Sequence, residues 1–148
     1  MSNNPDLTDR SAKLSVEKKM TANPDDIYIA WTKQFEQWFA APGTLTSNVE
    51  EDGLYFFETH FENGRHPHYG RFLSLVPGKL VEQTWVTGEL GAGGAETVVR
   101  VELERVSDGT NVTLTHAGFY DEDAMLGHKE AWPVVLDLLE FHLIENNI

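Results

Sequence analysis

Short alternating runs separated by turn residues fill the sequence from Leu45 to His116, and this feature constrains the fold most. In "TVVRVELERV", Val99, Val101 and Leu103 alternate with charged residues, the pattern of a strand with one buried and one solvated face. Turn-forming residues interrupt the runs at 51–53, 63–64, 77–78, 91–94 and 107–109. The region therefore predicts antiparallel strands joined by hairpins.

A strand and a helical segment precede this region. Residues 12–20, "AKLSVEKKM", alternate apolar and polar side chains and predict the first strand. Asn23 can then accept the free amides of a helix start, and Pro24 suits the first helical position. Aromatic residues follow at helical spacing, so one broken helix or two short ones should cover residues 24–40.

The last segment predicts a long amphipathic helix. Its apolar stripe consists of Trp132, Val135, Leu136, Leu139 and Leu143. Pro133 removes one backbone donor, so we expect a kink or a fresh helix start near residues 129–133.

The order of elements predicts an α+β, helix-grip fold. In this fold a curved antiparallel sheet of about seven strands wraps around the long C-terminal helix, and two short helices follow the first strand. Residues 1–11 should form a flexible tail, and residues 12–148 a single domain. A sheet that grips a helix leaves space for a ligand between them. The run "GLYFFETHF", apolar at both parities near its start, suggests a strand covered on two sides or lining that space.

Composition excludes several functions. The net charge of −13 argues against nucleic-acid and anionic-membrane partners, because both require basic side chains. The absence of cysteine excludes thiolate chemistry and Cys-ligated metals. Without an evident targeting or membrane-spanning segment, a cytoplasmic protein without a cofactor is expected, either a monomer or a homodimer.

The sequence resembles a known family, the Hsp90-ATPase-activator-like group of the START-like, polyketide-cyclase-like (SRPBCC) helix-grip superfamily. The phrases that carry the resemblance, in order, are "QWFAAPG", "HYGRFLSLVPGKLVEQTW", "DGTNVTLTHAGF" and "GHKEAWPVVLDLLE". Together they span about residues 12–145. The resemblance implies the helix-grip fold and a possible chaperone partner. Chaperone-activating relatives carry an additional N-terminal domain, which we do not expect in this protein, so the resemblance ranks that activity second.

Two stretches contain histidines at spacings that a metal site or an acid–base site could use. His116 and His128 are twelve residues apart on different elements, and Asp121, Glu122 and Asp123 suit the first turn of a helix, so a structural joint explains this stretch. His66 and His68 share a strand face, but Pro67 between them favours an exposed edge or loop. No metal site is predicted.

The glycines of "TGELGAGGAET" precede a strand rather than a helix, so they predict a hairpin and not a phosphate-binding loop.

The leading hypothesis is that the cavity binds a small apolar, aromatic or lipid-like ligand without catalysis. The predicted lining is Trp38, Phe56, Tyr69, Trp85, His116, Phe119, Trp132 and Leu136. Tyr69 and His116 would supply the polar contacts. Two alternatives remain: a modulator of an Hsp90-type chaperone ATPase, and a cyclase or hydrolase that uses His116 and Tyr69 as acid and base.

Overall fold

Seven strands and two α-helices build the structure, a computed structural model that describes residues 4–61, 64–88 and 93–146. In chain order the elements are β1 (Ala12–Met20), α1 (Pro24–Lys33), the 3₁₀ helix η1 (Phe35–Gln37), β2 (Thr46–Ser47), β3 (Leu54–Phe61), β4 (Gly64–Val76), β5 (Leu80–Thr87), β6 (Thr97–Val106), β7 (Gly109–Phe119) and α2 (Glu122–Glu145). The predicted α+β order is therefore confirmed.

Within the described residues the strands form one antiparallel sheet in the order β1-β7-β6-β5-β4-β3-β2. Consecutive strands from β2 to β7 are hairpin neighbours, as the alternating runs predicted. The first strand pairs with the last, placing Leu14 opposite His116. Residue 63 of the predicted turn at 63–64 and residues 91–92 of that at 91–94 lie outside the described ranges.

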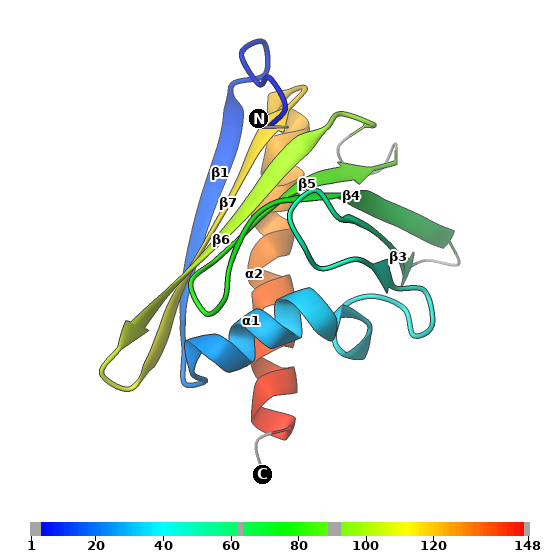
Figure 1. Ribbon diagram of the computed structural model, residues 1–148. Coiled ribbons are helices and arrows are strands. Elements are labelled where there is room, and N and C mark those ends of the chain that lie inside the picture. The colour runs from blue at the N-terminus through cyan, green and yellow to red at the C-terminus, as the bar shows by residue number, and fades with distance from the viewer. Residues whose placement is uncertain (1–3, 62–63, 89–92, 147–148) are drawn as a thin grey trace.

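The curved sheet lies against α2, and α1 crosses the C-terminal half of that helix (Figure 1). A hydrogen bond of 3.0 Å between His142 Nε2 and Gln34 Oε1 joins α2 to the end of α1. The rings of Trp31 on α1 and Trp132 on α2 lie 6.1 Å apart. The two helices are thus fixed to each other on the concave side of the sheet.

Both helices begin at the capping residues that the sequence indicates. The side chain of Asn23 accepts a hydrogen bond from Asp26 N at 2.9 Å, with Pro24 at the first helical position. Asp121 caps α2 by accepting from Ala124 N at 2.8 Å. The helix then continues through Pro133, so no fresh start occurs at residues 129–133.

Of the two alternatives expected for strand β3, coverage on both sides is wrong, whereas its residue Thr59 does line the cavity between sheet and helix. Tyr55 and Phe57 are buried, whereas Leu54 and Phe56 point outward and are 62% and 38% exposed. Apolar residues therefore occupy both faces of β3, but only one face is covered.

Candidate functional site

A cavity of about 640 Å³ lies between the sheet and the first half of α2. Residues of β3, β4 and β5 form one wall, and α2 residues from Asp123 to Val135 form the other. The α2 wall contains small residues at Ala124, Gly127 and Ala131, where larger side chains would occupy the space. A Cβ atom built on Gly127 meets no other atom within 4 Å.

Three apolar aromatic side chains are among the residues that line the cavity. Trp85 of β5 and Trp132 of α2 face each other with ring centroids 5.3 Å apart, and Phe39 also lines the space. Because Trp85 and Trp132 are each only 2% exposed, the core holds both rings in place. The two indoles therefore form a fixed aromatic part of the cavity wall.

His66 and His68 both line the cavity, so the predicted shared face is confirmed, although this face is not an exposed edge. The imidazole of His68 stacks on Phe57 at 4.8 Å, and its Nδ1 lies 3.0 Å from the carbonyl oxygen of His66. Burial lowers the pKa of His68 to about 4. Pro67 has no N–H to donate and lies where β4 is paired with β3, just before the pairing of β4 with β5 begins at His68.

His128 of α2 contributes a second imidazole to the cavity. Its Nδ1 lies 2.9 Å from the carbonyl oxygen of Ala124, one helical turn earlier. Its ring packs against His116 and Phe119, each with centroids at 4.9 Å. Burial lowers the pKa of His128, so this imidazole is neutral at pH 7.

Two charged side chains, Arg65 and Asp123, also line the cavity. Arg65 is bound to Glu58 through Nε–Oε1 and Nη2–Oε2 contacts of 3.0 and 3.2 Å. These hydrogen bonds from Arg65 lower the pKa of Glu58. The guanidinium is therefore already neutralised by a bidentate partner.

His116 lies in the core next to the cavity, with both ring nitrogens paired. Trp132 Nε1 donates to His116 Nδ1 at 3.0 Å, so Nε2 carries the hydrogen and donates to Thr97 Oγ1 at 2.7 Å. Thr97 Oγ1 donates in turn to the carbonyl oxygen of Trp85. Burial, with His128 nearby, holds the pKa of His116 well below its ordinary value. This imidazole serves as a structural link between β7, β6 and α2.

The structure brings some of the predicted lining residues together. Trp85 and Trp132 line the cavity. Phe119 and Leu136 are each 1% exposed and pack in the core behind it, as His116 does. Trp38 lies to one side, where its Nε1 donates to the carbonyl oxygen of Ala30 at 2.9 Å.

Phe56 and Tyr69 lie on the opposite face of the sheet, and their predicted place in the cavity is wrong. They are paired across β3 and β4 and line a separate depression of about 360 Å³. The physical reason is strand alternation: Tyr55 and Phe57 point to the core, so Phe56 and its partner Tyr69 point outward. His116 and Tyr69 therefore do not form the acid–base pair considered from the sequence.

Several cavity residues were not predicted, among them Phe39, His128 and Gly127. One signal for them was available. Ala124, Gly127 and Ala131 recur at helical spacing near the start of α2, and a stripe of small residues on a gripped helix indicates room beside it. The same stripe contains His128.

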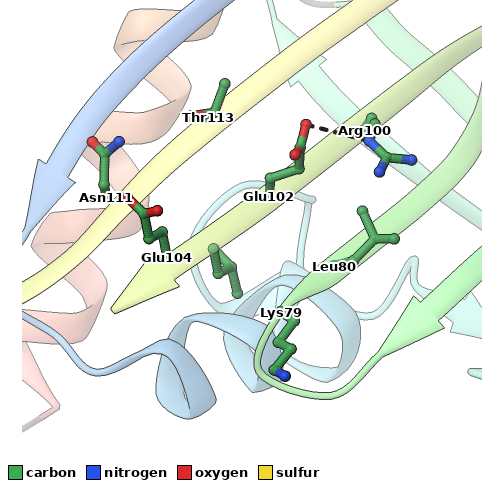
Figure 2. A pocket seen from close by; sticks show the side chains of 8 residues that line it. Lys79, Leu80, Arg100, Glu102, Glu104, Asn111 and Thr113 are labelled. Atoms are coloured by element: carbon green, nitrogen blue, oxygen red, sulfur yellow. Dashed lines mark hydrogen bonds and ion pairs between the residues drawn. The ribbon is translucent and has the colours of Figure 1, made fainter. Parts of the chain in front are cut away.

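A second depression, of about 250 Å³, lies over β5, β6 and β7 (Figure 2). Its charged residues alternate with the buried Val99 and Val101, so they project from the solvated face. Arg100 pairs with Glu82 at 3.1 Å and with Glu102 at 3.3 Å. Arg100 is thus paired with two carboxylates on an open surface. This depression is a solvated face of the sheet.

Among the residues that the structure describes, no group of three or more histidine or acidic side chains is arranged to hold a metal ion. In the same part of the chain, neither helix combines the length and the apolar character needed to cross a membrane.

The family model described as activator of Hsp90 ATPase homolog 1-like protein matches residues 21–143. The chain belongs to this family. The resemblance of the sequence to the Hsp90-ATPase-activator-like group is thereby confirmed. No match was found among curated proteins.

Solved structures share the fold of this member of the activator of Hsp90 ATPase homolog 1-like family. Protein MLL2253 from Mesorhizobium loti is 21% identical with a TM-score of 0.76, covering 93% of this chain and 100% of that one. CalU16 from Micromonospora echinospora is 20% identical with a TM-score of 0.72, covering 89% and 76%. The Aha1 dimer from Colwellia psychrerythraea is 21% identical with a TM-score of 0.69, covering 87% and 93%.

Proposed function

We propose that this protein binds a small apolar or aromatic molecule in the cavity between β3–β5 and α2. The observation that carries the proposal is the cavity itself, whose volume of about 640 Å³ lies within the range of small-molecule sites. Its walls combine Trp85 and Trp132 with a few polar groups, the usual composition of such sites. Burial of the ligand would supply affinity, and no catalytic step is involved.

The small residues of α2 allow a direct test. Gly127→Leu should narrow the cavity without a backbone clash, because a Cβ at this position meets no atom within 4 Å. Glu130→Leu is the matched control, since it adds the same side chain to an exposed position of the same helix outside the cavity lining.

The probe is N-phenyl-1-naphthylamine, whose fluorescence rises in apolar surroundings. The wild type and Glu130→Leu should bind it with similar affinity, and Gly127→Leu should bind it at least about tenfold more weakly. Probe at about 100 times its Kd should stabilise the wild type by about 2.7 kcal/mol. Failure of the wild type to bind, or equal binding by Gly127→Leu, would count against the proposal.

A second candidate function, modulation of an Hsp90-type chaperone ATPase, is supported by the family match. Helix α2 offers a surface for such a partner, because Val134, Leu138 and Phe141 form an exposed apolar row and are 60%, 43% and 64% exposed. Exposed apolar rows of this kind are typical of interaction surfaces.

Adding the protein should then change the rate of ATP turnover by an Hsp90-type chaperone. Phe141→Asp should remove the effect. Gly127→Leu should retain it, because this change affects the cavity and leaves the exposed row intact. Unchanged turnover on adding the wild-type protein would contradict this function.

A further inference from the structure

Hydrogen bonds to backbone carbonyls fix the tautomers of His68 and His128, two of the three imidazoles that line the cavity. Nδ1 of His68 lies 3.0 Å from the carbonyl oxygen of His66, and Nδ1 of His128 lies 2.9 Å from that of Ala124. A carbonyl oxygen can only accept, so each Nδ1 must carry the hydrogen and donate it. In a neutral imidazole the other nitrogen, Nε2, is then a hydrogen-bond acceptor.

Both imidazoles are neutral near pH 7, because burial lowers the pKa of His68 to about 4 and also lowers the pKa of His128. In the part of the chain that the structure describes, each ring makes its backbone hydrogen bond through Nδ1, which leaves Nε2 as the acceptor nitrogen. Nε2 of His68 and Nε2 of His128 are therefore two hydrogen-bond acceptors on residues that line the cavity.

His116 shows that the fold can satisfy both nitrogens of an imidazole when the ring belongs to the core. Its Nδ1 accepts from Trp132 and its Nε2 donates to Thr97, and the ring does not line the cavity. His68 and His128 differ from it, because both rings line the cavity and each uses Nδ1 on a backbone carbonyl.

We propose that the ligand is a flat aromatic molecule bearing at least one hydroxyl group, which donates a hydrogen bond to Nε2 of His68 or His128. This inference rests on the proposed function and adds the chemical class of the ligand. The aromatic side chains in the lining, Phe39, Trp85 and Trp132, favour an aromatic body. A carboxylate would set its lone pairs against those of the imidazoles, whereas a hydroxyl group can donate to them.

The test compares three probes that share one ring system: 2-naphthol, 2-methoxynaphthalene and naphthalene. Only 2-naphthol can donate a hydrogen bond. Their Kd values are measured by displacement of N-phenyl-1-naphthylamine from the wild type, from the double variant His68→Phe/His128→Phe, and from the control His60→Phe. His60 is an exposed histidine on β3 outside the cavity lining.

The wild type and His60→Phe should bind 2-naphthol about 2- to 10-fold more tightly than 2-methoxynaphthalene, as one net hydrogen bond provides. The double variant should lose this preference and still bind naphthalene. Equal binding of 2-naphthol and 2-methoxynaphthalene by the wild type, or a preference that survives in the double variant, would overturn the inference while leaving the cavity function intact. Failure of the wild type to bind any of the three aromatic probes would instead refute the proposed function.

Discussion

Acidification should destabilise this protein through His68, and the structure gives the size of the effect. Burial of the imidazole between Phe57 and Trp85 lowers its pKa from 6.5 to about 4. Above pH 6.5 the ring is neutral in both the folded and the unfolded chain, so it does not change stability with pH. Below that value His68 becomes protonated in the unfolded chain, whereas in the folded protein it stays neutral down to about pH 4. At about 1.4 kcal/mol per pH unit, the loss of unfolding free energy over this interval is about 3 kcal/mol.

Urea denaturation followed by tryptophan fluorescence, at a series of pH values from about 7.5 to about 4, measures this loss. Other groups also titrate in this interval, so the informative quantity is the difference between the wild type and two variants. His68→Asn keeps an amide donor near the carbonyl of His66, and His68→Phe keeps a ring on Phe57. Both variants should lose about 3 kcal/mol less than the wild type. Parallel pH profiles for the wild type and both variants would refute the argument that burial of His68 suppresses its protonation.

Four further results are expected. Gly127→Ala should raise the free energy of unfolding by about 0.5–1 kcal/mol, because the added methyl group meets open space in a helix interior; destabilisation in urea would contradict this. Asp121→Ala should lower it by about 1 kcal/mol through loss of the α2 cap, measured in the same assay. Thr97→Val should lower it by about 1–3 kcal/mol by leaving the buried His116 Nε2–H without an acceptor; a neutral outcome would rule out the hydrogen-bond chain. Tyr69→Phe should leave the Kd for N-phenyl-1-naphthylamine unchanged, since this side chain lies on the far face of the sheet.

Local sequence patterns were sufficient for the elements and their order. The Asn23 and Asp121 caps act within three residues of themselves, so their chemistry does not depend on the rest of the fold. Alternation of Val99 and Val101 with charged residues likewise identifies a half-buried strand without knowledge of its neighbours.

The same patterns failed where the answer depended on which face of a strand meets the helix. Phe56 and Phe57 are adjacent and chemically alike, yet one is 38% exposed and the other fully buried. Their difference follows from the register of β3 against β4 and from the side of the sheet on which α2 packs. Neither is encoded in the local run of residues.

The sequence by itself thus determined the α+β fold, the helix starts and the excluded chemistries, because these depend on local pattern and composition. Only the tertiary structure decided which histidines line the cavity and which nitrogens they present. His116 is satisfied by Trp132 and Thr97, which are distant in sequence, whereas His68 and His128 use their Nδ1 on nearby carbonyls and keep Nε2 as an acceptor. The physical reason is that a hydrogen-bond partner is assigned by proximity in space, which long-range packing alone establishes.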